Sequence, residues 1–256
     1  MRHQLSAVTA ALTATTRSAV TEITVPGGKG KVFTLQEIRI VNYPTVETVV
    51  NSGGIVEVEN DSVDYKPLKL VTRIISCVTE GGGQIKPNIY KVNCPLPAGS
   101  KVQFYANPFD NQSQKYAYTI VYDDAKAFRG PQTYAESDLG TAITQVTIDT
   151  DHLTFTIPNG KAGDLQSLLV IAEGTLETVV DQGGLIDVNS KSIPTLSPME
   201  QYIGGATCVD AGGADVEVEV VDLRGHKAPG GAVIDVDYTP QDNQSQNLAG
   251  SLVWTH

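Results

Sequence analysis

The chain repeats itself at a spacing of about 130 residues, and this duplication limits its possible folds more than any other feature. The block TVETVVNSGG at 45–54 returns as TLETVVDQGG at 175–184, and DNQSQ at 110–114 returns unchanged at 242–246. Weaker matches keep nearly the same spacing: 24–29 with 156–161, 77–78 with 208–209, and 97–99 with 229–231. A period above about 100 residues is too long for a solenoid repeat and fits a complete domain. The sequence therefore predicts two similar domains in tandem.

Within each unit the apolar residues alternate as they do in half-buried β-strands. Three such runs are predicted to place one face inward: Tyr116, Tyr118, Ile120 and Tyr122; Val216, Val218 and Val220; and Ile234, Val236 and Tyr238. Turn signals rich in Gly, Pro, Asn and Asp separate the runs. Many short strands with such turns are typical of sandwiches and jelly rolls. We therefore expect an all-β fold of two tandem antiparallel β-sandwich (jelly-roll) domains.

The repeated blocks also predict where the units begin and end. Residues 1–18 are expected to form an N-terminal arm or short helix that the product retains, 19–124 the first jelly roll, 125–139 a linker, and 140–256 the second jelly roll. The linker is marked by Arg129-Gly130-Pro131.

The repeated DNQSQ blocks are the most prominent candidate sites. Their members are Asp110, Asn111 and Gln112 in the first unit and Asp242, Asn243 and Gln244 in the second. Asp and Asn close turns through their own backbone, so a structural turn or a contact between subunits is the favoured interpretation. Carboxylate and amide oxygens also ligate Ca²⁺, which leaves an ion site as the alternative, although the spacing is not that of an EF-hand loop.

Other reactive residues are scattered through the sequence. The three cysteines, Cys77, Cys94 and Cys208, lack metal-ligand spacing, and buried small side chains are their favoured role. The histidines fit surface or terminal positions, and the paired Gly53-Gly54 and Gly183-Gly184 fit turns at strand entries. Glu47 and Glu177 occupy equivalent places, but nothing in the sequence brings them together. We therefore expect no enzyme, no catalytic residue, no cofactor and no bound metal.

Charge is distributed unequally between the units. The formal net charge is −11, yet residues 140–256 carry −12 and residues 19–124 carry −1. Two copies of one fold with different surfaces are expected to occupy different environments in an assembly, although an acidic solvated face is the simpler alternative. The overall acidity argues against specific nucleic-acid binding, while Arg2 and Arg17 offer a local basic patch.

Two tandem sandwiches after an arm resemble the double jelly-roll major capsid proteins of tailless icosahedral viruses. The resemblance covers the architecture of residues 19–256 and is carried by the duplication, the strand pattern and the blocks VPGGKGK, ETVVNSGGIVEVEND and YANPFDNQSQ. The chain differs from most members of that family in being short.

The resemblance implies a structural protein of a virion capsid. Its partners would be two further copies in a homotrimer of six similar rolls, the higher shell or lattice, other capsid proteins, and an internal membrane nearby. The arm with Arg2 and Arg17 would lie on the inner face or bind an adjacent subunit. Two alternatives remain open: a non-viral extracellular or cell-surface lattice or tube protein, and a tandem β-sandwich carbohydrate-binding protein.

Overall fold

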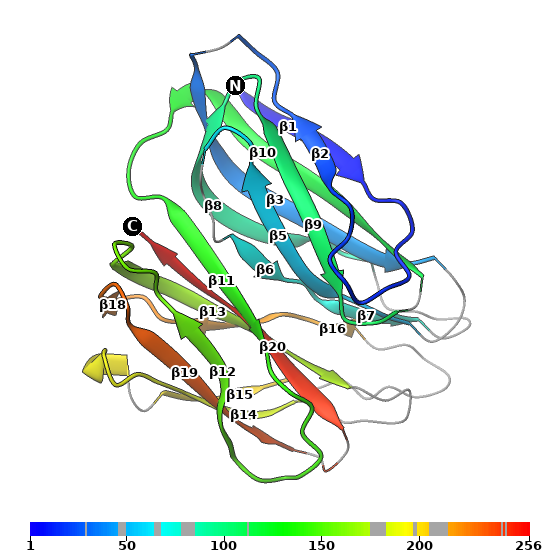
Figure 1. Ribbon diagram of the computed structural model, residues 1–256, viewed down its shortest axis with the longest axis vertical. Helices are drawn as coiled ribbons and strands as arrows, with labels where there is room; N and C mark the ends of the chain where they lie inside the picture. Colours follow the sequence, from blue (N-terminus) through cyan, green and yellow to red (C-terminus); the bar gives the residue numbers. More distant parts are fainter. Residues whose placement is uncertain are drawn as a thin grey trace.

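The chain folds into two β-sandwiches packed one above the other (Figure 1). The structure, a computed structural model, describes the following residues: 1–28, 30–45, 50–63, 68–77, 85–111, 113–174, 183–196, 199–204, 215–241, 243 and 245–256. Within these ranges the helical content is one 3-10 turn, η1 (Pro194–Leu196). No helix in the described residues has the length and apolar character needed to span a membrane.

The first sandwich is an eight-stranded jelly roll. One sheet has the strand order β1-β10-β3-β8 and the facing sheet has the order β2-β9-β5-β6. The strands are β1 (Arg2–Val8), β2 (Thr21–Thr24), β3 (Val32–Pro44), β5 (Gly54–Asn60), β6 (Lys69–Val71), β8 (Asn88–Pro97), β9 (Lys101–Pro108) and β10 (Gln114–Ala127). All the pairings within these two sheets are antiparallel.

The second sandwich repeats this order strand for strand. Its sheets run β11-β20-β13-β17 and β12-β19-β14-β15, and a short strand, β18, also pairs with β13. The strands are β11 (Thr133–Leu139), β12 (Asp149–Thr156), β13 (Gly163–Gly174), β14 (Gly184–Asn189), β15 (Met199–Ile203), β17 (Glu219–Asp222), β18 (Lys227–Ala228), β19 (Val233–Pro240) and β20 (Gln246–Thr255). The predicted fold class, two antiparallel jelly rolls from an internal duplication, is confirmed.

A small fifth sheet joins the two rolls. It has the order β16-β7-β4 and is built from β4 (Val50–Ser52), β7 (Ile74–Cys77) and β16 (Asp215–Val216). Strands β4 and β7 belong to the first half of the chain, whereas β16 comes from the second. Backbone hydrogen bonds therefore cross from one roll to the other.

Each roll has its own core, built as the alternating sequence predicts. Tyr116, Tyr118 and Ile120 on β10 are fully buried, as are Ile234, Val236 and Tyr238 on β19. The prediction for Val216, Val218 and Val220 holds for Val216, which is buried, and for Val218, which packs against the core, but it is wrong for Val220, which is 58% exposed while its neighbour Val221 is buried. The cause is a change of partner, because β16 pairs with β7 of the first roll and β17 pairs with β13.

The expected domain boundaries need correction at the start of each roll. Residues 1–18, expected to be an arm or a short helix, contain β1, which pairs with β10 from Arg2 to Val8. Residues 125–139, expected to be a linker, contain β11, which pairs with β20. Both strands lie at a sheet edge. Strand β1 alternates exposed with half-buried residues, whereas Thr133, Tyr134 and Ala135 of β11 are buried in succession, so neither strand shows the alternation of buried apolar residues on which the prediction relied.

Candidate functional site

The first DNQSQ block ends on a buried glutamine that organises the turn around it. Gln114 is fully buried at the start of β10. Its Oε1 accepts a hydrogen bond of 3.2 Å from the backbone N–H of Gly53, and its Nε2 donates one of 3.0 Å to the carbonyl of Asp110. The Tyr116 hydroxyl donates to the Gly53 carbonyl at 2.6 Å and lies 3.1 Å from the same Gln114 Oε1. The repeated block is therefore a structural device that joins two turns.

The second block builds the same network. Gln246 is fully buried, and its Oε1 accepts a hydrogen bond of 3.1 Å from the backbone N–H of Gly183. The Tyr238 hydroxyl lies 2.9 Å from both the Gly183 carbonyl oxygen and Gln246 Oε1. The favoured interpretation of the blocks as turns fits both networks.

The glycine that follows each turn is required by a close approach between strands. Gly54 pairs with Pro108, and Gly184 pairs with Pro240. A Cβ at Gly54 would overlap the carbonyl oxygen of Asn107, and a Cβ at Gly184 would overlap that of Thr239. The repeated Gly-Gly pairs thus mark strand entries, as the sequence predicted, and Gly183 itself has a φ of 124°.

The predicted residues of the two blocks differ in what they contribute. Asp110 supplies its carbonyl oxygen to Gln114, while Asn111 and Asn243 are exposed. Gln112, Asp242 and Gln244 lie outside the described residues, as do Glu47, Glu177 and Cys208. Within the described part of the chain no three His, Cys, Asp or Glu residues are grouped to hold a metal. The sequence reasoning missed Gln114 and Gln246, although both close the repeated pentapeptide.

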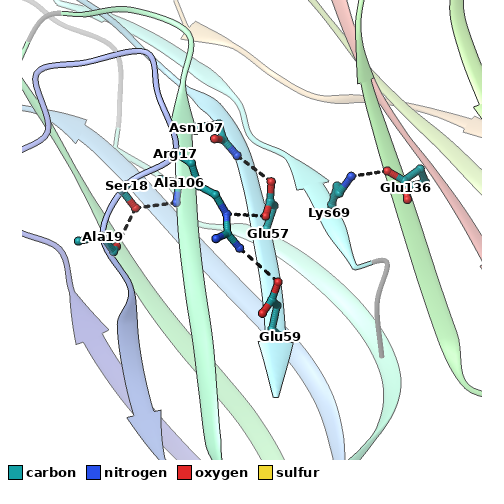
Figure 2. A network of polar contacts seen from close by, with 9 residues as sticks. All are labelled: Arg17, Ser18, Ala19, Glu57, Glu59, Lys69, Ala106, Asn107 and Glu136. Carbon is teal, nitrogen blue, oxygen red and sulfur yellow. Dashed lines mark hydrogen bonds and ion pairs between the residues drawn. The ribbon is translucent and has the colours of Figure 1, made fainter. Parts of the chain in front are cut away.

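The two arginines assigned to the arm are bound to their own roll. Arg2 forms an ion pair with Glu37 on β3. Arg17 lies over the ring of Tyr105 at 3.5 Å. It also reaches Glu57 at 2.8 Å and Glu59 at 3.2 Å (Figure 2). The adjacent Ser18 exchanges hydrogen bonds with the backbone of Ala106. The segment between β1 and β2 is thereby fixed across the outer face of the sheet β2-β9-β5-β6.

Polar contacts lock the two rolls together where β6 meets the second roll. The backbone N–H of Val71 donates to Ser251 Oγ at 2.8 Å, and Lys69 reaches Glu136 at 2.5 Å (Figure 2). Arg73, whose side chain is 5% exposed, binds Glu217 at 2.7 Å. That guanidinium holds the pKa of the Glu217 carboxyl below its ordinary value.

Apolar side chains complete this roll–roll contact. Ala135, Leu169, Ile171 and Ala249 of the second roll are buried in the core cluster of the first, which includes Leu70. A parallel bridge joins Leu68 to Ala135. Because burial of one Leu or Val side chain contributes about 1.5–3 kcal/mol, the contact couples the stabilities of the two rolls.

The outer face of the sheet β12-β19-β14-β15 is acidic, unlike its counterpart in the first roll. Asp187, Asp235 and Asp237 alternate with buried apolar residues, and the backbone N–H of Asp151 on β12 donates a hydrogen bond of 2.7 Å to Asp237. Burial raises the pKa of Asp235 above its ordinary value, with a further contribution from the charge of Asp151, against a hydrogen bond from Thr154. The two rolls therefore present different electrostatic surfaces on one backbone plan.

Cys94 is a buried residue of the inter-roll region. Its Sγ donates to the Thr133 carbonyl at 3.5 Å, and burial raises the pKa of the thiol to about 12. A protonated, enclosed thiol is a poor nucleophile. The expectation of a buried small side chain is confirmed for Cys94, whereas the Cys77 side chain lies outside the described atoms.

Comparison with known proteins gives similarities of architecture. No protein-family model matches the chain, and no curated protein matches it either. Among solved structures, the glycosylasparaginase PNGase F of Flavobacterium meningosepticum has a TM-score of 0.47 at 8% identity, over 99% of this chain and 96% of that one. A chain of the Sulfolobus turreted icosahedral virus has a TM-score of 0.45 at 10% identity, over 100% and 90% of the two chains.

The major capsid protein P2 of bacteriophage PM2 has a TM-score of 0.42 at 9% identity, over 100% of this chain and 98% of that one. The fold assignment rests on the strand order of the chain itself, which makes it an all-β double jelly roll.

Proposed function

We propose that the protein is a structural self-assembly protein, a viral major capsid protein whose building block is a homotrimer of double jelly rolls. The observation that carries this proposal is the roll–roll contact. Shared core residues, the Val71–Ser251 hydrogen bond and the sheet β16-β7-β4 join the rolls into one two-roll unit. A unit with two similar halves can meet near-equivalent neighbours on several sides, which favours closed shells.

The charges of the rolls support different positions in such a shell. With the boundary placed by the strands, residues 1–128 hold 13 Lys and Arg against 11 Asp and Glu, giving +2. Residues 129–256 hold 5 against 18, giving −13. The first roll, which carries most of the Lys and Arg, can then meet the acidic second roll when copies join, and such charge complementarity guides association and suppresses wrong pairings. The proposed location is a virion capsid, with other copies and other capsid proteins as partners.

The proposal assigns no catalytic role to any residue. Arg2, Arg17 and Lys69 are engaged in ion pairs, and the turn networks of Gln114 and Gln246 are closed by backbone groups. These arrangements hold the fold together and leave the assembly surfaces as the functional part of the molecule.

Electron microscopy and light scattering of the purified full-length chain test the proposal directly. We expect closed particles of uniform size, or trimers that form them as the concentration rises. Open filaments would support a surface lattice instead. A monodisperse monomer would contradict assembly, and glycan-array binding or release of N-glycans from a glycoprotein by that monomer would identify a carbohydrate-binding protein or an amidase.

A further inference from the structure

The contact between the rolls has a defined geometry. Because the two rolls are similar, the same contact can form a second time from the equivalent surfaces. In the chain, the outer face of the sheet β11-β20-β13-β17 covers β6, the edge strand of the first roll. Ser251 on β20 accepts the hydrogen bond from the backbone N–H of Val71 on β6. Both residues are fully buried. One roll therefore supplies a face and the other supplies an edge.

The strand registers identify the equivalent edge on the second roll. Gly54 pairs with Pro108, and the next residue, Ile55, pairs with Val71. Gly184 pairs with Pro240, and the next residue, Leu185, pairs with Tyr202. Tyr202 on β15 thus occupies the position that Val71 occupies on β6.

The same comparison identifies the equivalent face on the first roll. Ser251 pairs with Ser137 on one side and Leu169 on the other. Thr119 on β10 pairs in the same way with Ser6 and Arg39. Thr119 therefore occupies the position of Ser251, and a hydroxyl is present at both.

Among the described residues of one chain, no roll covers this second face or this second edge. Tyr202 is 77% exposed, whereas Val71 is fully buried. Val8, at the edge of the equivalent face, is 54% exposed. An edge strand presents unpaired backbone groups, and Tyr202 adds an exposed aromatic ring beside them, so this edge is available for contact with another chain.

The charges of the uncovered face and edge are complementary. Arg2, Arg39 and Lys115 belong to strands of the sheet β1-β10-β3-β8, where Arg2 and Arg39 share the single carboxylate of Glu37 and so leave this cluster net positive. Glu200 on β15 and Asp187 on β14 pair with one another beside Tyr202, within the roll of net charge −13. A face from one copy can therefore approach an edge from another with favourable electrostatics.

We propose that the outer face of the sheet β1-β10-β3-β8 covers strand β15 of a second copy of this chain. The contact repeats between chains the one that the rolls make within a chain, with Thr119 of one copy beside Tyr202 of the other. It rests on the proposed self-assembly and specifies its geometry. Each copy uses a face on its first roll and an edge on its second, so the arrangement is head-to-tail and can close into a ring.

Cross-linking between differently labelled copies tests this geometry. Chains carrying Thr119→Cys and chains carrying Tyr202→Cys are mixed, allowed to assemble and treated with a short bis-maleimide. We expect a dimer band several-fold stronger than that from Thr24→Cys mixed with Tyr202→Cys, because Thr24 is exposed on the opposite sheet of the same roll. The unsubstituted chain gives the background from its own cysteines. Ser6→Cys is a second partner for Tyr202→Cys if Thr119→Cys fails to fold.

The outcomes separate this inference from the proposed function. Particles without a cross-link above the Thr24→Cys control would overturn the face-to-edge contact and leave self-assembly standing. A strong cross-link from Tyr202→Cys alone would show edge-to-edge pairing of two β15 strands and would also overturn it. A monomeric unsubstituted chain would contradict both proposals. Tyr202→Ser should abolish assembly while leaving the melting temperature of the dissociated chain unchanged, since the side chain is exposed.

Discussion

Tyr116 and Tyr238 carry a hydroxyl to the same point of their rolls from two different strands. Tyr116 reaches the Gly53 carbonyl from β10, while Tyr238 reaches the Gly183 carbonyl from β19. The strand registers place Ala106 at the position of Tyr238. They also place Leu248 at the position of Tyr116. The hydrogen bond has thus been kept while the residue that makes it has changed.

This exchange predicts that the tyrosine can be moved. Tyr116→Phe should lower the free energy of unfolding by about 1 kcal/mol, because it removes one buried hydrogen bond. Tyr116→Leu alone should destabilise the protein because it leaves a cavity in the core. Ala106→Tyr alone should destabilise it because it overfills the core. The double variant recreates the arrangement of the second roll, so its loss of unfolding free energy should be smaller than the sum of the two single losses. Denaturant titrations of the four proteins measure this coupling, and simple additivity would contradict it.

Tyr118 is the control for hydroxyl removal. It is fully buried against Phe104, with ring centroids 4.5 Å apart, and its hydroxyl has no hydrogen-bond partner among the described residues. Burial raises the pKa of this phenol above its ordinary value. Tyr118→Phe should therefore leave the free energy of unfolding unchanged or raise it by up to about 1 kcal/mol. A loss equal to that of Tyr116→Phe would contradict the assigned partners.

Ser251→Ala tests the lock between the rolls. The substitution leaves the buried N–H of Val71 without its acceptor and should lower the free energy of unfolding by about 1–3 kcal/mol. For a chain of this size each kcal/mol corresponds to roughly 2–4 °C in the melting temperature. Ser137→Ala, on the neighbouring strand and half-buried, should change it by less than about 0.5 kcal/mol. Equal effects from both variants would contradict the lock.

Asp235→Asn tests the acidic face of the second roll. The pKa of Asp235 is raised in the folded protein, so its ionised form lowers stability above the ordinary value of 3.8, and protonation relieves this as the pH falls. The variant should therefore melt at a higher temperature than the parent at about pH 7, with a smaller gain at about pH 3.

Asp222→Asn is the matched control, because the pKa of Asp222 is shifted in the opposite direction from that of Asp235. Hydrogen bonds from Arg224 lower the pKa of Asp222 to about 2. Its small stabilising effect is present at neutral pH and is lost as the pH falls through that pKa. Asp222→Asn should therefore give no gain at neutral pH, and an equal gain from both variants would show a general effect of net charge.

Arg17→Ala should release the segment between β1 and β2 without unfolding the roll. Arg17 is partly exposed, so its ion pairs and its contact with Tyr105 together contribute only about 1 kcal/mol. We expect faster proteolysis within residues 9–16 and a small change in melting temperature. Arg224→Ala, which removes an exposed ion pair elsewhere, should leave the proteolysis pattern unchanged.

The sequence predicted the parts of the fold that carry a strong periodic signal. The alternation around Ile234 and Tyr238 and the repeated Gly-Gly pairs led directly to buried strands and strand entries. The first strand of each roll was missed because the matching residues differ chemically. His3 stacks on Tyr122 in the first roll, and Tyr134 stacks on Trp254 at the equivalent place in the second. The stacked pair is thus present in both rolls although both of its residues differ, and a comparison of residue types does not detect it.

The candidate site was predicted less completely than the fold. The DNQSQ blocks drew attention to their polar first residues, yet the buried Gln114 and Gln246 at their ends organise the turns. The covering of β6 by β20 could not be predicted from spacing, because it depends on which outer face packs on which edge. The small side chains of Ala249 and Ser251 that permit this approach are common in any strand.

The bond between Val71 and Ser251 joins residues 180 positions apart. At about 5–20 residues per second, a ribosome needs roughly 10–40 s to make that stretch of chain. During this interval the nascent first roll carries an apolar edge strand with nothing to cover it, and such an edge is a template for aggregation. The protein therefore depends on a late event in its own synthesis, and fragments that stop before β20 should require chaperones or accumulate as insoluble material.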